Sequence, residues 1–306
     1  MEIKQGPLTQ LVEDWLNDQA RTEGSKATYR RAFAVYNKWI IRNTHAQNAL
    51  GATRDDVVRF KASLEARLCD NTVFNYMVVV KGFHRYAYRL GKMRTDPTQG
   101  IRVKAPRKMH RKKPLNDEQK FQLMASLDLT IKRGRRDRLI LLLMLQAGLR
   151  CIEVSRLNYG DLYYEFGGYR LRLQRKGQTA KNTVIPLRND LGHELAEFLD
   201  DKSTNEMPMF ASLSTKNRDA IVRLSSEEVS DIVTRRMKEA GVFGKQLGPH
   251  SLRHTYGCDL VKKGVPLEDI QLLMGHSSPA TTMIYAIDAK EQRIEKNNPA
   301  ELLDRL

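Results

Sequence analysis

The stretch LGPHSLRHTYG, residues 247–257, places two histidines, an arginine and a tyrosine in an otherwise ordinary helical pattern. His250 and Arg253 are three residues apart, so on a helix they project from the same face. Leu252 and Tyr256 fall near the opposite side, at the spacing of a buried stripe. Taken alone, an H-x-x-R pair is more often a solvated polar face than a functional site, so the rest of the chain has to decide.

The size and charge of the chain narrow the class of protein. It has 306 residues, enough for two domains, and a formal net charge of +16, which predicts a polyanionic partner such as nucleic acid or a membrane surface. The longest apolar run, 139–149, is too short to span a bilayer and indicates a buried helix, and the N-terminus has no signal-peptide core. Three scattered cysteines suggest neither a disulfide framework nor a zinc cluster. We therefore expect a cytoplasmic protein that faces nucleic acid and no membrane.

The densest charge lies in one short segment. IRVKAPRKMHRKK, residues 101–113, carries seven basic and no acidic side chains, and it contains Pro106 and precedes Pro114. This composition favours an extended linker between two domains. A basic run is usually only solvated, but one that joins two domains of a basic protein is expected to follow a phosphate backbone. The predicted DNA-binding residues are Lys104, Arg107, Lys108, Arg111, Lys112 and Lys113.

The pattern before this linker is helical. Four segments carry apolar residues at three-to-four spacing, namely 8–20, 25–41, 53–68 and 71–91. Ser25, Thr53 and Asn71 are candidate N-caps, and Gly91 is a candidate helix stop. The first 100 residues therefore predict a small helical bundle.

The pattern after the linker begins with a capped helix at 115–127 and continues with a buried helix that ends at Gly148. Arg150 lies at the turn into the next helix. An arginine so close to an apolar helix is costly unless it is paired or directed at an anion. Glu153, three residues on, could brace its guanidinium group.

A small sheet is expected next, within an otherwise helical domain. Residues 163–187 predict strands with turns at Gly167-Gly168 and around Gly177, and they carry Lys176 at a turn tip. Five further helices are predicted, at 190–201, 225–240, 250–263, 266–274 and 279–287. The fold class is therefore mainly α, with one small antiparallel β-sheet.

The segment PLEDIQLLMGHSSPATTMIYAIDA, residues 266–289, combines several features that are weak when taken singly. A helix ends at Gly275 and is followed by His276, and Pro279 starts a new helix that carries Tyr285. A tyrosine on a helix is normally a packing residue, and a Gly-His pair at a helix end is normally a cap.

Together these features resemble the tyrosine recombinase (phage integrase) family. The H-x-x-R pair is followed 23 residues later by Gly-His and nine further on by a tyrosine. AGLRCIEVSRLNYGDL resembles the first arginine box of the family, HSLRHTYG the second and LLMGHSSPATTMIYA the nucleophile box. The helical segments before the linker resemble the core-binding domain more loosely, and the compact length is similar to Xer-type members. The resemblance implies four regions: a helical DNA-binding domain 1–100, a linker 101–114, a mixed α/β catalytic domain 115–288 and a tail 289–306 for subunit contact.

The resemblance also implies a catalytic set, namely Arg150, Lys176, His250, Arg253, His276 and Tyr285. Tyr285 would attack the phosphorus and form a 3′-phosphotyrosyl link, and the two arginines would bind the phosphate oxygens. Lys176 would protonate the leaving 5′-oxygen. Glu153 would be a structural support of the site. His250 would donate to the phosphate or help take the tyrosine proton, and His276 would bind the phosphate. Because the number of bonds does not change, no metal or other cofactor is expected.

The implied partners are double-stranded DNA with a specific recombination site and further copies of the chain, as a tetramer on two duplexes. The chain departs from the family pattern at Arg175, where the family usually has glycine before the hairpin lysine. Lys181 lies in the same turn region, so it is an alternative to Lys176 as the general acid. Two other functions remain open: a type IB topoisomerase, and a non-catalytic DNA-binding regulator on the same scaffold.

Overall fold

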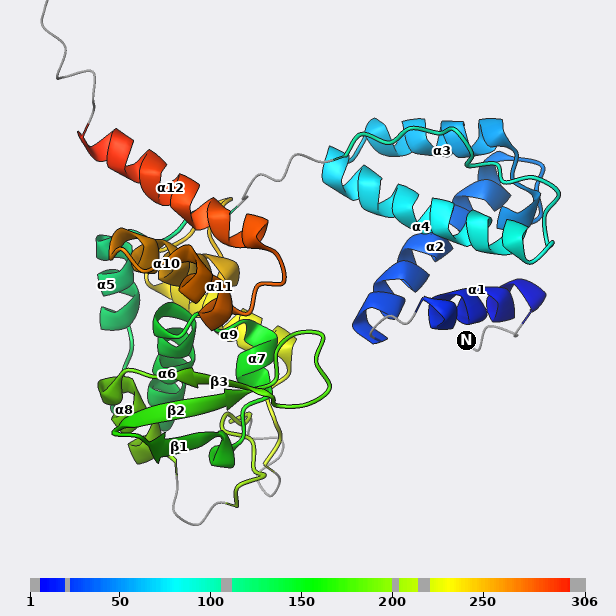
Figure 1. The fold of residues 1–306 in the computed structure, drawn as a ribbon. Coiled ribbons are helices and arrows are strands. Elements are labelled where there is room, and N and C mark those ends of the chain that lie inside the picture. Colours follow the sequence, from blue (N-terminus) through cyan, green and yellow to red (C-terminus); the bar gives the residue numbers. More distant parts are fainter. Residues whose placement is uncertain (1–5, 20–22, 106–111, 200–203, 214–220, 298–306) are drawn as a thin grey trace, which may run out of the picture. The chain divides into compact units, whose positions relative to one another are not determined.

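The computed structural model describes residues 6–19, 23–105, 112–199, 204–213 and 221–297. The chain divides into two compact units, residues 1–109 and 110–306, and each has its own hydrophobic core (Figure 1). The boundary between the units falls within the basic segment 101–113. Within the described residues, no helix is long and apolar enough to cross a membrane.

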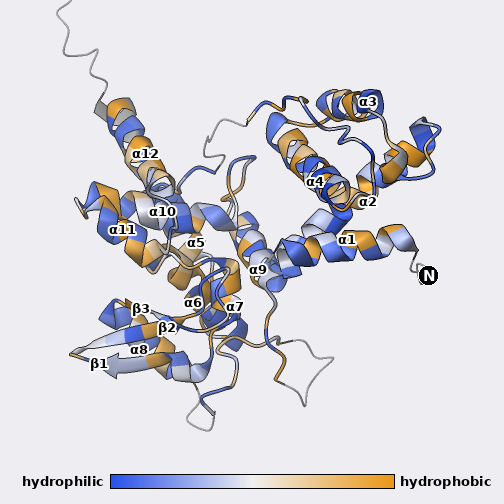
Figure 2. Ribbon diagram, turned by 45° about the vertical axis from the view of Figure 1, so that its right-hand side comes forward, coloured by the Kyte–Doolittle hydropathy of each residue, from blue (hydrophilic) through white to orange (hydrophobic). Residues whose placement is uncertain are grey.

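The N-terminal unit consists of the four predicted helices. They are α1 (Pro7–Asp18), α2 (Glu23–Asn43), α3 (Arg54–Glu65) and α4 (Asp70–Arg89), with a 3-10 turn at Ala49–Gly51. Hydrophobic and hydrophilic residues alternate along these helices, as amphipathic helices require (Figure 2). Trp15, Tyr36, Phe60 and Phe83 fill the core and are at most 1% exposed. Full burial of side chains of this kind stabilises a fold by roughly 1.5–3 kcal/mol each.

Of the three predicted N-caps in this unit, one is confirmed. The Thr53 hydroxyl accepts a hydrogen bond from the Asp56 amide, and the Asp56 carboxylate accepts one from the Thr53 amide at 3.0 Å. The predictions for Ser25 and Asn71 were wrong, because α2 already begins at Glu23 and α4 at Asp70. At both helices an acidic residue occupies the first turn, where it complements the helix dipole.

The second unit is built around α6 (Lys132–Gln146), in which Leu139, Ile140, Leu141, Leu142, Leu143 and Met144 are all buried. Helix α10 (Pro249–Lys262) packs against α6, and α12 (Pro279–Asn297) packs against α10. In Figure 1, α10 and α12 lie at one end of the unit, the β-sheet lies at the other, and α6 lies between them. The remaining helices are α5 (Asp117–Ala125), α7 (Cys151–Ser155), α8 (Asn189–Phe198), α9 (Ser226–Glu239) and α11 (Leu267–Met274), with a 3-10 turn at Tyr159–Asp161.

The expected small antiparallel sheet is present. It has three strands in the order β1 (Leu162–Glu165), β2 (Gly168–Leu173) and β3 (Thr183–Pro186). The first hairpin turn lies one residue earlier than predicted, at Phe166-Gly167, because Gly168 already pairs with Glu165. Together with the helices, the sheet confirms the predicted fold class.

Helix α12 is longer than the predicted helix at 279–287. It continues to Asn297, because residues 288–297 contain good helix formers and neither glycine nor proline. The expected start of the tail, at 289, therefore lies inside a helix. Residues 298–306 lie outside the described residues.

Candidate active site

Arg150 and Glu153 form the first part of the site, at the start of α7. The Arg150 amide donates to Oε2 of Glu153 at 2.9 Å, and Nη1 of Arg150 donates to Oε1 at 2.8 Å. Glu153 is fully buried. The carboxylate therefore braces the Arg150 guanidinium, as the sequence predicted.

Arg253 enters the same cluster from α10 and is only 4% exposed. Its Nη1 donates to the carbonyl of Gly148 and lies 3.6 Å from Oε2 of Glu153, and its Nη2 donates to the carbonyl of Met274 at 2.5 Å. Burial, followed by the charge of Arg150, lowers the pKa of Arg253 to about 10. The group is therefore still positively charged at neutral pH.

Arg175 is a third guanidinium in the cluster and was not predicted as a site residue. It is 4% exposed, its Nη1 donates to Oε2 of Glu153 at 3.3 Å, and its Nη2 donates to the carbonyl of Leu273. One buried carboxylate thus meets three guanidinium groups. Two positive charges of this cluster are not balanced by Glu153, an arrangement suited to a bound anion such as a phosphodiester.

His276 follows the end of α11 and lies beside Arg253. Its Nε2 accepts a hydrogen bond from Nη2 of Arg253 at 3.1 Å, because a guanidinium can only donate, and its Nδ1 lies 3.0 Å from the hydroxyl of Thr282. Burial, followed by the nearby arginines, lowers the pKa of His276 to about 4. The imidazole is therefore neutral at pH 7, with its proton on Nδ1. Thr282, one turn before Tyr285 on α12, is a supporting residue that sequence analysis missed.

Tyr285 is buried against this cluster, at 3% exposure. Its ring stacks on His276 with centroids 5.7 Å apart and contacts His254 at 5.0 Å. It also lies over Gly257 of α10, where a Cβ atom would come within 2.8 Å of the ring. Burial raises the pKa of the Tyr285 hydroxyl, although Arg253 lowers it in part. The phenol is protonated at neutral pH and needs a base in order to act as a nucleophile.

A second contact holds α12 on α10. Nε2 of His254 lies 2.5 Å from Oδ2 of Asp288, and the thiol of Cys258 lies 3.9 Å from the same nitrogen. The three ligand-type atoms are within 4.8 Å of one another. The His254–Asp288 distance is that of a direct hydrogen bond, so this pair fixes the helix that carries Tyr285 one turn beyond the tyrosine.

The other two members of the predicted catalytic set lie outside the buried cluster. His250 is exposed in the first turn of α10, whereas Arg253 on the same helix is buried. Lys176 is exposed in the loop between β2 and β3. Lys181, the alternative general acid, forms an ion pair with the buried carboxylate of Asp161.

The predicted DNA-binding residues of the linker fall into two groups. Lys104 pairs with Asp70 at 2.9 Å on the surface of the N-terminal unit, Nζ of Lys112 donates to the carbonyl of Leu247 at 3.1 Å, and the backbone amide of Lys113 donates to the carbonyl of Gln246 at 3.1 Å. Arg107, Lys108 and Arg111 lie outside the described residues.

The second unit matches a known sequence family. Residues 113–292 match the profile of the Phage integrase family. The matched range contains every residue of the buried cluster. The chain belongs to the phage integrase family.

Two relatives and one solved structure illustrate where the chain lies in the phage integrase family. It is 30% identical to tyrosine recombinase XerA of Thermococcus kodakarensis over 81% of this chain and 82% of that protein. It is 27% identical to tyrosine recombinase XerC of Chlamydia caviae over 81% of this chain and 78% of that protein. The XerH site-specific recombinase, in a post-cleavage complex with its difH substrate, shares the fold with a TM-score of 0.66 at 20% identity, over 82% of this chain and 73% of that chain.

Proposed function

We propose that this phage integrase is a site-specific DNA recombinase that cleaves and rejoins strands through a 3′-phosphotyrosyl intermediate. The observation that carries the proposal is the position of Tyr285, buried against His276 and Arg253 in a cluster with two unbalanced positive charges. The named relatives XerA and XerC are tyrosine recombinases, and the XerH complex contains a recombination substrate. In this proposal residues 1–100 bind DNA, 101–114 link the domains and 115–288 catalyse the reaction.

In the proposed cleavage step, the Tyr285 oxygen attacks the phosphorus while the bond from phosphorus to the 5′-oxygen breaks. Arg150 and Arg253 bind the two non-bridging oxygens and offset the charge that builds in the transition state. His276 hydrogen-bonds the phosphate as the tautomer with its proton on Nε2, the nitrogen that Arg253 frees when it turns to the phosphate. Lys176 protonates the leaving 5′-oxygen. His250 takes the tyrosine proton or donates to a phosphate oxygen.

In the proposed rejoining step, the 5′-hydroxyl of a partner strand attacks the phosphotyrosine and releases Tyr285. Each step exchanges one phosphoester bond for another, so the free energy of the original bond is kept in the intermediate. The chemistry therefore needs no metal ion or ATP. The proposed substrate is double-stranded DNA with a specific recombination site.

The decisive experiment is to incubate the protein with random-sequence duplexes, isolate covalent protein–DNA complexes under denaturing conditions and sequence the attached DNA. A recombinase should yield one enriched site. Efficient relaxation of a supercoiled plasmid that lacks this site would instead indicate a type IB topoisomerase. DNA binding without any covalent complex would indicate a non-catalytic regulator.

The proposed role of the linker leads to a prediction about salt dependence. Glutamine substitutions at the six predicted DNA-binding residues of the linker should reduce the slope of log K against log salt by about 0.9 for each phosphate that the linker no longer neutralises. The measurement is DNA affinity by fluorescence anisotropy over a range of salt concentrations. Arg188→Gln, which removes a surface pair with Asp190, is the control and should leave the slope unchanged. An unchanged slope in the linker variant would show that the run is only solvated.

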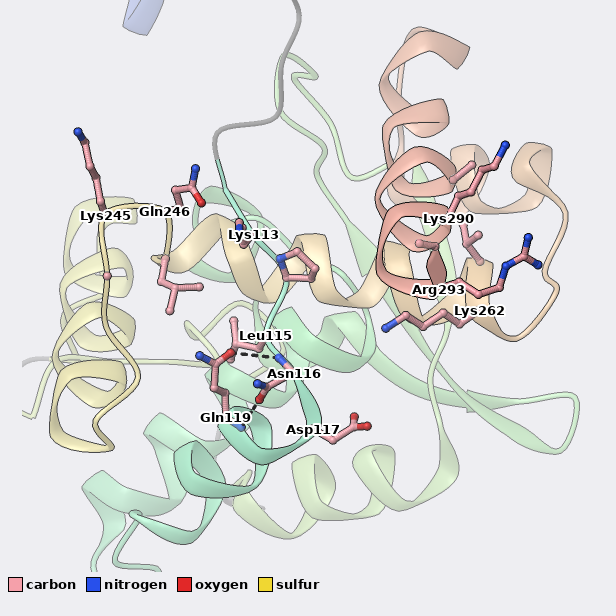
Figure 3. A pocket seen from close by; sticks show the side chains of 16 residues that line it. Lys113, Leu115, Asn116, Asp117, Gln119, Lys245, Gln246, Lys262, Lys290 and Arg293 are labelled. Atoms are coloured by element: carbon pink, nitrogen blue, oxygen red, sulfur yellow. Dashed lines mark hydrogen bonds between the residues drawn. The ribbon is translucent and has the colours of Figure 1, made fainter. Parts of the chain in front are cut away.

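A basic groove on the second unit supports the proposed role of the tail. Its volume is about 1140 Å³, and its cationic lining residues are Lys113, Lys245, Lys262, Lys290 and Arg293. Figure 3 shows Lys262, Lys290 and Arg293 together on the side formed by α10 and α12. The sequence of the tail complements this lining, because it combines Leu302 and Leu303 with the acidic residues Glu301 and Asp304. We propose that the groove receives residues 298–306 of a neighbouring copy in a tetramer on two duplexes.

Deletion of residues 298–306 should therefore weaken assembly on DNA. The deletion begins after α12 and leaves that helix intact. We expect fewer multi-subunit complexes and unchanged binding of a single subunit, both measured by native gel shift. Glu301→Lys with Asp304→Lys keeps the length of the tail and should weaken assembly in the same way. Normal tetramer formation by the deletion variant would contradict the proposal.

A further inference from the structure

Arg175 links two parts of the active site that lie far apart in the sequence. It follows β2, in which Leu171 and Leu173 point into the core and Arg172 is exposed. Arg175 continues this alternation and is also buried. Its side chain reaches Glu153 at the start of α7 and Leu273 in the last turn of α11.

The backbone of Arg175 determines where Lys176 lies. The Gln178 amide donates to the carbonyl of Arg175 at 3.0 Å, which closes a four-residue turn with Lys176 in its second position. Gly177 occupies the third position with φ of 88°, which a residue with a side chain rarely adopts. Nη1 of Arg156 approaches the same Arg175 carbonyl at 3.5 Å. Because the turn is this short, a displacement of Arg175 also displaces Lys176.

The other end of the link lies just before His276. The neighbouring carbonyls of Leu273 and Met274 accept hydrogen bonds from Arg175 and Arg253 respectively. Gly275 follows with φ of 59°, and a Cβ atom there would lie 2.8 Å from Nε of Arg175. Glycine is therefore required both by the backbone conformation and by the close approach of the arginine. Nε of Arg175 is buried and has no hydrogen-bond partner among the described residues, so Nη1 and Nη2 make the link.

We propose that Arg175 is a positioning residue that holds the turn carrying Lys176 against the segment carrying His276. The link places the ammonium group of Lys176 at the leaving 5′-oxygen once a phosphodiester occupies the site. This inference rests on the proposed recombinase function. A glycine at this position would have no side chain that could make the link, so the device depends on the arginine of this chain.

The catalytic test compares Arg175→Met with Arg172→Met, a matched control that removes an exposed arginine of β2 lying over the Tyr163 ring. The substrate is the DNA site recovered by covalent trapping. We expect Arg175→Met to cleave it about 10²-fold more slowly, as misplacement of a catalytic group by about 1 Å can cause. On the same DNA with sulfur bridging at the 5′ position, which needs no acid, cleavage should return close to the wild-type rate. Equal impairment on both substrates, or none on either, would overturn the inference.

A second measurement does not depend on catalysis. Hydrogen exchange of the amides of residues 174–182 should be faster in Arg175→Met than in Arg172→Met or wild type, because the turn no longer has its anchor. Unchanged exchange would overturn the inference. If Arg175→Met does not fold, Arg175→Lys replaces it in both measurements, since a single ammonium cannot bridge Glu153 and Leu273 as a fork does. If the wild type forms no covalent adduct, the proposed function fails, and the exchange measurement still decides whether Arg175 anchors the turn.

Discussion

Replacement of Tyr285 by phenylalanine is expected to abolish the covalent protein–DNA adduct and to leave DNA binding nearly unchanged. The substitution removes only the attacking oxygen. The ring still packs against His276, His254 and Gly257, so the buried site keeps its shape. Loss of a nucleophile lowers the rate of an enzyme by roughly 10⁴-fold or more. Adduct formation is measured on denaturing gels, and binding is measured by anisotropy.

The matched control for this prediction is Tyr169→Phe. Tyr169 lies on β2 in the same unit, and its hydroxyl is 3.2 Å from Nδ1 of His193. This variant should form the adduct as the wild type does. An undiminished adduct in Tyr285→Phe would show that another group attacks the phosphorus and would remove the basis of the proposed mechanism.

Alanine substitutions at Lys176 and Arg253 are both expected to slow cleavage strongly, for different reasons. Loss of Lys176 removes the proton donor, so the 5′-oxygen must leave as an unprotonated alkoxide, which is a poor leaving group. General acid catalysis typically raises the rate of such a step by about 10²–10⁴-fold. Loss of Arg253 removes charge that stabilises the transition state, at a cost of roughly 10²–10³-fold per donor. Only the first defect disappears when sulfur replaces the 5′-bridging oxygen, because a thiolate leaves without protonation.

The expected pattern is therefore rescue of Lys176→Ala and persistent impairment of Arg253→Ala and Arg150→Ala on the sulfur substrate. Single-turnover cleavage rates on both substrates provide the measurement, and thermal melts check that each variant is folded. Lys181→Ala is the matched control, and its ion pair with Asp161 predicts a stability defect without a specific sulfur rescue. Rescue of Lys181→Ala alone would reassign the general acid, and rescue of neither lysine variant would place it elsewhere in the site.

Most of the fold could be predicted from local sequence patterns. The four N-terminal helices and the N-cap of Thr53 depend on residues a few positions apart, and the strands of the small sheet pair with neighbours no more than 16 positions away. The predictions that failed concern the ends of helices. These ends also depend on local sequence, but the spacing of apolar residues does not locate them. Helix α12 extends beyond its predicted end, because neither glycine nor proline occurs between Pro279 and Pro299.

The sequence alone also placed Arg150, Glu153, Arg253, His276 and Tyr285 in recognisable motifs of the phage integrase family, and the structure brings these five residues together. Their catalytic roles remain predictions. Recognition was possible because each motif is short and its internal spacing follows from one helix or one turn.

Tertiary structure decided how the motifs combine. No local pattern shows that Glu153 is shared by three guanidinium groups, that Tyr285 is buried against His254, or that Arg175 bonds to Leu273. The alternation of Leu171, Leu173 and Arg175 could have indicated that Arg175 points inward, but not which groups it meets. These interactions join residues up to about a hundred positions apart in the sequence, for example Arg175 and Leu273, 98 positions apart. The sequence determines which charged and aromatic side chains are available. Only the packing of α7, α10, α11 and α12 determines which of them lie together in a buried site, where a charge is costly unless it is paired with a protein group or a bound anion.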